Sequence, residues 1–472
     1  MLPVNCGSHA DYQNLVVENL RKYYPNPDFL ARSTWDIIER FWHLDLSDTD
    51  TLLTHKYSKF GPAPRTPSCM QRSYLLSIDF KVSSITEWAA QLKMNPLFAI
   101  LSGFQVGDTP GVGTFYDFMK RLWDSDDPHM TSHIHPLKAK VKKPDAKGEK
   151  AASVEKVTVA ELLPQLEKTA FPLNDQPYAS LFKIYQKEFL DVSVEKGLIH
   201  KDSLALAGDG TPVVTSHRER KKRICKCKEN GINDCSCDRY FSQPDCDIGW
   251  DSSRDCFYHG YDLYMLVDSQ SDLPVFPHYS YASKHDSHGF LQAFFRMRAF
   301  LPDYKVSKVL LDSAHDAMPY YQYFKRQNIT PFIDLNGKGG RPPVYKNDFT
   351  IDKDGVPVCP SGHRMRRDGI EVAKGRMKFK CPKISHTGGC ISCTCDKPCS
   401  KAKYGRTVHL ILNDNPRLFN NPPRSSKEWK LEYNARTSAE RSNKREKLDF
   451  KLEDGRHRST KMWYCRLYHI LM

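Results

Sequence analysis

The chain lacks the sequence features that direct a protein into or across a membrane. Its first residues, MLPVNCGSHADYQN, contain neither a basic start nor an apolar segment, so no secretory signal is expected. No run of about 18 apolar residues occurs, which excludes a transmembrane helix. We therefore expect a cytoplasmic protein whose 15 cysteines are thiols or metal ligands in a reducing compartment, not disulfides.

The chain is also short of acidic residues relative to basic ones. It has 70 Lys and Arg against 56 Asp and Glu, a net charge of +14, and its 40% hydrophobic residues are typical of a globular protein. A length of 472 residues allows two to four domains. A basic chain of this kind more often binds nucleic acid than a small metabolite.

The pattern of residues divides the chain into segments. Residues 1–135 show apolar spacing typical of small helices, and the segment GVGTFYDFMKRLW predicts a helix that either enters a DNA groove or simply packs in a bundle. Residues 136–200 contain a Lys-rich linker followed by helices. Residues 336–425 are rich in Gly, Pro and Cys and interrupt the pattern on either side, which indicates an insertion.

Between 201 and 335 the pattern favours a mixed α/β sheet, with three strands followed by helix, strand, helix and strand. The segment SLALAGDGTPVV predicts a strand that reaches Asp209 and then turns, and SKVLLDS predicts a buried strand that ends at Asp312. Chemistry in α/β sheets is placed at such strand ends. Taken singly, Asp209 is equally well explained as a turn residue and Asp312 as a helix N-cap.

A third acidic residue stands in the polar stretch YNARTSAERSNKREK, residues 433–447. If this stretch is one α-helix, Arg436, Glu440 and Lys447 share one face with Tyr433, within roughly 60° of arc. Such a face is either a solvated surface or a functional one. Carboxylates that converge from separate elements repel one another unless protons or cations neutralise them. Asp209, Asp312 and Glu440 together therefore predict a site for two divalent cations that serve phosphodiester chemistry.

The spacing of Tyr433, Arg436, Glu440 and Lys447 matches, residue for residue, the Y-(2)-R-(3)-E-(6)-K motif of DDE-type transposases of the bacterial insertion-sequence-4 superfamily. The chain resembles that family elsewhere too. AGDGTPV is similar to its first-Asp strand, HGYDLYMLVD with LPVFPHYSYASKHDS to its strand pair and following loop, and VLLDSAHDAMPYYQYFKRQNITPFIDLN to its second-Asp strand, helix and strand. Two departures are Asp262 and Tyr264, where relatives often have Lys and His. Asp316 is a rival to Asp312 as second acid, but Asp312 directly ends the apolar strand.

The resemblance implies a ribonuclease-H-like catalytic core, built from residues 201–335 and 426–472 and interrupted between the second Asp and the Glu. A helical domain, residues 1–135, would precede it, bind transposon ends and dimerise. Asp209, Asp312 and Glu440 would bind Mg²⁺ or Mn²⁺. Tyr433, Arg436 and Lys447 would contact DNA phosphates.

The implied function is DNA transposition, by cleavage of the element's ends and joining of the 3′-OH to target DNA. The implied partners are terminal inverted repeats, target DNA and a second copy of the chain, with the protein associated with the bacterial nucleoid. Two alternatives stay open, a zinc-stabilised DNA-binding protein that no longer cuts and a DDE-type nuclease that cuts without joining.

Two cysteine clusters are candidates for Zn²⁺, which thiolates bind well. The Cys-rich insert 217–256 contains two C-x-C pairs astride a turn. Residues 359–399 combine CPSGH with C-x2-C, a spacing typical of a zinc ribbon, and we favour this second cluster. The alternative for both is free thiols in tight turns. The candidate ligands are Cys225, Cys227, Cys235 and Cys237 in the first cluster, and Cys359, Cys381, Cys390, Cys393, Cys395 and Cys399 in the second.

Overall fold

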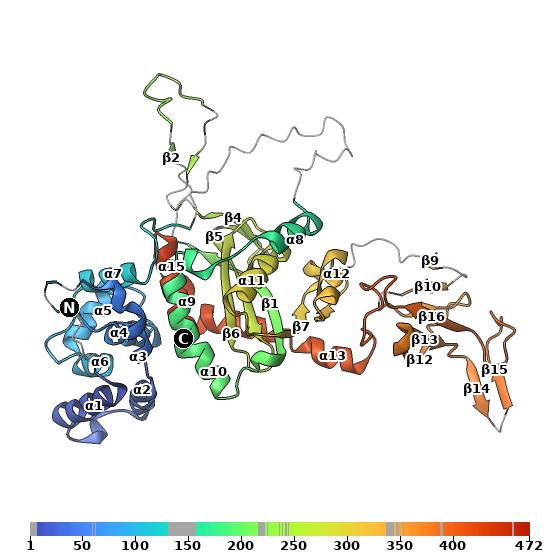
Figure 1. Ribbon diagram of the computed structural model, residues 1–472, viewed down its shortest axis with the longest axis horizontal. Helices are drawn as coiled ribbons and strands as arrows, with labels where there is room; N and C mark the ends of the chain where they lie inside the picture. Colours follow the sequence, from blue (N-terminus) through green and yellow to red (C-terminus); the bar gives the residue numbers. More distant parts are fainter. Residues whose placement is uncertain are drawn as a thin grey trace.

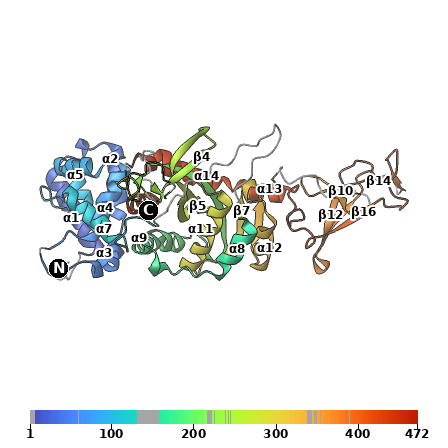
Figure 2. The same ribbon diagram turned by 90° about the horizontal axis from the view of Figure 1, so that it is seen from above.

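The N-terminal helices lie at one end of the molecule, the large sheet in the middle, and the small strands of residues 344–411 at the other end (Figure 1; Figure 2 gives the view from above). Among the described residues, no helix has both the length and the apolar character that a membrane crossing needs. This computed structural model describes residues 7–58, 60–61, 63–130, 157–215, 222–223, 225–235, 237, 239–240, 243, 245–336, 344–345, 349–352, 354–387, 390–455 and 457–472.

The N-terminal part is helical, and residues 71–125, where apolar spacing predicts small helices, lie mainly in α4 to α7. Local signals set the helix ends. Ser8 caps α1 by accepting from the backbone N–H of Asp11, whose carboxylate accepts from Ser8 in return. Gly103 ends α6 with φ +83°, a conformation that favours glycine. The helices are α1 (His9–Tyr23), α2 (Arg32–His43), α3 (Ser47–Leu53), α4 (Pro67–Asp79), α5 (Ile85–Met94), α6 (Pro96–Ser102) and α7 (Val112–Arg121).

A six-stranded sheet forms the centre of the molecule. β5 is antiparallel to β1, and on its other side it pairs with β4 and β6, also antiparallel. β7 runs parallel to β1, and β8 runs parallel to β7. The mixture of parallel and antiparallel strands confirms the predicted α/β class with a mixed sheet. The strands are β1 (Leu204–Val214), β4 (Asp247–Asp251), β5 (Cys256–Asp268), β6 (Pro274–Tyr281), β7 (Val306–Leu311) and β8 (Thr330–Ile333).

Helices cover the sheet. α11 (Asp286–Phe300) packs on β1, β5 and β6, and α8 (Val159–Lys168) packs outside it against α11 and α12 (Met318–Arg326). α14 (Thr437–Lys444) packs on β1 and β5. Two further elements, α13 (Lys427–Asn434) and the π-helical turn η8 (Arg445–Asp449), flank α14 along the chain. The residues after 425 therefore return to the sheet that residues 204–333 build.

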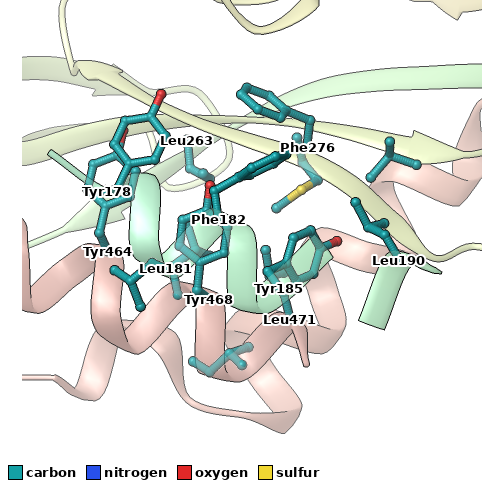
Figure 3. Packing of buried hydrophobic residues seen from close by; sticks show 14 of the residues in the cluster. Tyr178, Leu181, Phe182, Tyr185, Leu190, Leu263, Phe276, Tyr464, Tyr468 and Leu471 are labelled. Carbon is teal, nitrogen blue, oxygen red and sulfur yellow. The ribbon is translucent and has the colours of Figure 1, made fainter. Parts of the chain in front are cut away.

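One hydrophobic core extends from the N-terminal helices to the sheet. Figure 3 shows α9 (Ala179–Tyr185) and α15 (Thr460–Leu471) within it. The ring of Tyr178 stacks on that of Tyr464 with centroids 4.7 Å apart, and Phe182 meets Phe276 of β6 edge to face at 5.6 Å. α15 also packs against α4 and α7, so the C-terminal segment joins the helical part to the sheet. Between α9 and β1 the chain continues through the π-helical turn η4 (Gln186–Asp191) and α10 (Val192–Glu195).

The insertion has a small core of its own, separate from the main one. It includes Phe349, Ile351, Met377 and Phe379, with Cys359 among the buried residues. Its strands are β9 (Val344–Tyr345), β10 (Phe349–Ile351), β11 (Pro357–Val358), β12 (Arg366–Glu371), β13 (Arg376–Lys380), β14 (Ile384–Thr387), β15 (Cys390–Cys393) and β16 (Thr407–Ile411). Residues 131–156, which hold nearly all of the predicted Lys-rich linker, lie outside the described part of the chain.

Candidate active site

Asp209 lies inside β1, not at its end. The strand continues to Val214, so the predicted turn after Asp209 is wrong: GDGT stays extended because Asp209 pairs with Met265 and Gly210 with Tyr264 across the antiparallel ladder. Asn443 of α14 donates from Nδ2 to Asp209 Oδ2 over 3.3 Å. Successive residues of a strand point to opposite faces, so Asp209 faces α14 and Gly210 faces α11.

Asp312 follows the last residue of β7, as predicted, and caps the short helix η6 (Ser313–His315). Because Ala207 of β1 pairs with Leu310 of β7, Asp209 and Asp312 each stand two positions beyond the same pair on neighbouring strands. Oδ1 of Asp312 accepts from the backbone N–H of Ala314 at 3.1 Å and lies 2.6 Å from His315 Nδ1. The N-cap function and a place beside Asp209 therefore coexist at this residue.

The motif stretch is not the single helix that the spacing predicts. α13 ends at Asn434, α14 begins at Thr437, and a π-helical turn starts at Arg445, so the 100° step breaks before Arg436 and again before Lys447. The first three motif residues nevertheless stay together. Arg436 lies over the ring of Tyr433, 5.8 Å from its centroid, and its Nη2 is 2.6 Å from Glu440 Oε1.

The charges of Asp312 and Glu440 both act on the pKa of Asp209. Burial raises the pKa of Asp209 to about 7, with further contributions from the charges of Asp286, Asp312 and Glu440, while Arg436 opposes the rise. Burial also raises the pKa of Asp312, but hydrogen bonds from His315 and Ala314 outweigh it and lower that pKa overall. Neighbouring negative charges destabilise the ionised form of a carboxyl, and a cation bound nearby stabilises it.

The donor set suits Mg²⁺ or Mn²⁺, since these ions prefer carboxylate oxygens. The three carboxylates lie farther apart than the ligands of a metal ion do when it is bound. Within the described residues, the one group of three or more His, Cys, Asp or Glu ligand atoms that all lie within 4.8 Å of one another consists of cysteines. Glu440 is half exposed and paired with Arg436, so it must turn from the arginine to share an ion with the aspartates.

Lys447, which the resemblance assigns to DNA contact, is largely buried and already engaged by other groups. Lys447 is only 14% exposed. Its Nζ donates to Pro212 O at 2.7 Å and lies 3.2 Å from Glu453 Oε1, so it ties the π-helical turn to β1. Trp429, four residues before Tyr433, is buried, and its ring stacks on that of Tyr433 with centroids 4.5 Å apart, so it supports the motif tyrosine by packing.

Sequence reasoning missed Asp286 as part of the site and treated Asp262 only as a departure from the family. A Cβ at Gly210 would lie 2.6 Å from Asp286 Oδ1 and 3.3 Å from Asp262 Oδ1, so the glycine makes room for both carboxyls. Burial, then the charges of Asp286 and Asp209, raise the pKa of Asp262 well above its ordinary value. The sequence indicates only that Asp286 opens α11 after β6, which does not reveal its contact with Asp262.

Asp316, the rival second acid, is engaged elsewhere. Its two carboxylate oxygens lie 2.8 and 2.5 Å from Arg417 Nε and Nη2, and Tyr321 and the backbone of Asn336 also donate to it. Its side chain is fully buried. Asp316 therefore anchors the end of the insertion to α12, and Asp312 is the acid beside Asp209.

The first cysteine cluster forms the one compact ligand group noted above. Cys225 Sγ lies 3.5 Å from Cys235 Sγ, and Cys227 Sγ lies 3.6 Å from Cys237 Sγ. Tetrahedral Zn²⁺ with Zn–S bonds of about 2.3 Å places its sulfurs about 3.8 Å apart, so the group could hold such an ion. It occupies the loop between the short strands β2 (Lys222–Arg223) and β3 (Arg239–Tyr240), which projects from the sheet (Figure 1).

The charges of this cluster also favour a cation. The backbone N–H of Cys227 and the thiol of Cys235 lower the pKa of Cys225 to about 7. The thiols of Cys237 and Cys225 raise the pKa of Cys227 to about 12. One thiolate thus forms readily, and its charge disfavours ionisation of the neighbouring thiols. A bound metal ion would offset this repulsion.

The described side chains of the second cluster, which the spacing favours, form no group as compact as the first. Cys359 and Cys381 are buried, and burial together with the thiols of Cys359 and Cys381 raises the pKa of Cys399, so these three lie near one another. Cys395 instead approaches Lys397 O at 3.5 Å. The side chains of Cys390 and Cys393, in β15, lie outside the described part.

No protein-family model matches the chain, and no curated protein matches it. A functional assignment therefore depends on the residues and their geometry.

Proposed function

We propose that the protein is a DNA transposase of the DDE type, similar to the bacterial insertion-sequence-4 superfamily, with a ribonuclease-H-like core. The observation that carries the proposal is the convergence of three acids from distant elements. Asp209 lies in β1, Asp312 directly follows the neighbouring strand β7, and both Asp312 and Glu440 act on the charge of Asp209. The sheet order, with β5 and β6 antiparallel on one side of β1 and β7 and β8 parallel on the other, supports such a core.

Mg²⁺ or Mn²⁺ bound by the three carboxylates would activate the attacking oxygen and stabilise the leaving oxygen. The chain itself prepares this position. Asn443 holds one oxygen of Asp209, and donors at Oδ1 hold Asp312. Arg436 is paired with Glu440 in this structure; with an ion on Glu440, its guanidinium would be free to bind a DNA phosphate. The same residues would serve cleavage of the element's end and attack by the 3′-OH on target DNA.

DNA and a second copy of the chain are the partners that this function requires. The net charge of +14 supports phosphate binding. The helical N-terminal part, which shares its core with the sheet, would recognise the terminal repeats. Two ends joined to one target require at least a dimer on DNA. Zn²⁺ on the Cys225 cluster would hold the projecting loop, and the protein would act in the cytoplasm on nucleoid DNA.

Two alternatives differ from this proposal in what they do to DNA. A protein that binds without cutting would leave DNA intact with Mg²⁺ present, and a nuclease would cut but form no joined product. The test incubates the protein with a DNA fragment that carries the ends flanking its gene, with supercoiled plasmid as target. The proposal expects metal-dependent cuts at the ends and joined products. Cuts without joining favour the nuclease, and intact DNA favours the binding protein.

A further inference from the structure

A chain of three hydrogen-bonding side chains leads from the sheet to Asp312. Tyr264 Oη lies 2.9 Å from His315 Nε2, and His315 Nδ1 lies 2.6 Å from Asp312 Oδ1. Because a carboxylate only accepts, the Nδ1 side donates, and Nε2 then accepts from the tyrosine hydroxyl. The network thus fixes one tautomer and one orientation of the imidazole.

Two glycines make this arrangement fit. Tyr264 belongs to β5, and its ring passes beneath β1 at Gly208 to reach His315, which follows β7. A Cβ at Gly208 would lie 2.7 Å from Tyr264 Oη, and a Cβ at Gly289 would lie 3.0 Å from Tyr264 Cδ2. Thus Gly208, directly before Asp209, has a role that the sequence motif AGDGT does not reveal.

Packing shields the buried part of this hydrogen-bonded network from solvent. Tyr264 is fully buried and His315 is 1% exposed. The ring of Phe290 in α11 packs edge to face on both, with centroids 5.9 and 5.7 Å away. By contrast, the Asp312 side chain is 36% exposed. Tyr264 and His315 therefore form the buried end of this network, and the Asp312 carboxylate is its exposed end, which faces the site.

We infer that His315 and Tyr264 are positioning residues that hold Asp312 in the orientation needed to bind the divalent cation. This inference rests on the proposed function, because it takes Asp312 as a ligand. The two donors to this carboxylate, His315 Nδ1 and the backbone N–H of Ala314, both reach Oδ1, which leaves Oδ2 open to an ion. Hydrogen bonds of this kind around ligating carboxylates commonly change metal affinity or activity by about 10–100-fold.

The test measures Mn²⁺ binding by electron paramagnetic resonance, in the full chain without DNA. Tyr264→Phe removes only the hydroxyl that fixes the imidazole, and His315→Ala removes the donor to Asp312. We expect both to weaken Mn²⁺ binding, by about 10-fold or more for His315→Ala. Tyr304→Phe is the matched control, since it also removes a buried hydroxyl but lies outside this network. End-DNA affinity should stay unchanged.

The outcomes separate this inference from the proposed function. Wild-type protein that binds Mn²⁺ and cuts end DNA, together with Tyr264→Phe and His315→Ala variants of wild-type Mn²⁺ affinity, would overturn the inference alone. Wild-type protein that neither binds Mn²⁺ nor cuts would overturn the proposed function. If His315→Ala melts early, Tyr264→Phe decides, because its ring still fills the space beneath Gly208.

Discussion

Arg436 and Glu440 form an ion pair one helical turn apart, with Nη2 2.6 Å from Oε1. The arginine therefore occupies the carboxylate that the proposed function assigns to a metal ion. A phosphate contact by Arg436 should appear only when Glu440 releases it. Substituting the arginine tests both roles at once.

Arg436→Ala should weaken binding to end DNA and lower the slope of log affinity against log salt by about one unit, since one phosphate contact is lost. Arg436→Lys should keep the slope but lose the two-pronged geometry of the guanidinium. The measurement is a titration of labelled end DNA at several salt concentrations. An unchanged slope in Arg436→Ala would show that this arginine serves Glu440 alone.

Zinc should copurify with the chain through the cluster of Cys225, Cys227, Cys235 and Cys237. Elemental analysis of protein made without chelator should find at least about one Zn per chain. Cys225→Ser combined with Cys237→Ser should remove about one equivalent. Cys256→Ser, an exposed cysteine outside this group, is the control and should remove none. Equal zinc in all three proteins would exclude this site and turn attention to Cys359, Cys381 and Cys399.

The ion pair of Asp316 with Arg417 should be structural. Asp316→Asn leaves the partly buried Arg417 without its counter-charge, which typically costs about 3–5 kcal/mol of unfolding free energy. Asp303→Asn, at an exposed position, should cost almost nothing. Thermal melting compares the two variants. Equal melting temperatures would mean that the insertion is held to α12 by other contacts.

Stability should fall as pH rises from about 5 to 8 because of Glu446. Burial raises the pKa of this carboxyl from its ordinary value of 4.5 to about 8. The folded chain then keeps a proton that the unfolded chain has released, so the stabilisation is complete below the unfolded pKa and is lost as pH approaches 8. The slope from this group is at most about 1.4 kcal/mol per pH unit.

Glu446→Gln keeps the size of the side chain and removes its titration, so the pH dependence should flatten in denaturant unfolding measured across that range. Ser442, which donates to Oε1 at 2.8 Å, can donate to the amide oxygen as well. Parallel curves for the variant and the wild type would show that Glu446 ionises normally.

Sequence patterns predicted much of the sheet but not the details that make the site. The apolar run before Asp312 located the end of β7, because buried parallel strands read as continuous hydrophobic segments. The turn predicted at GDGT was wrong, because pairing with β5 keeps β1 extended through two glycines that usually signal turns. The one-helix model of residues 433–447 failed because helical spacing cannot foresee a break at Ala435 or a π-helical turn.

The tertiary partners of the site were beyond the reach of the sequence. Asp286 meets Asp262 only because Gly210 leaves space between elements that are far apart along the chain. The link from Tyr264 to Asp312 crosses beneath a strand, and no local periodicity records it. Similarly, the ion pair that engages Asp316 was out of reach, because its partner Arg417 lies in the insertion.

The most direct test of the proposed function compares single substitutions at the three acids in a cleavage assay with end DNA and Mg²⁺ or Mn²⁺. Asp209→Asn, Asp312→Asn and Glu440→Gln should each bind end DNA about as well as the wild type, yet lose cleavage and joining by orders of magnitude, because metal activation supplies much of the barrier reduction. Asp303→Asn should cut normally. Wild-type protein that never nicks its own end DNA, or acid variants that cut as fast as the wild type, would contradict the account.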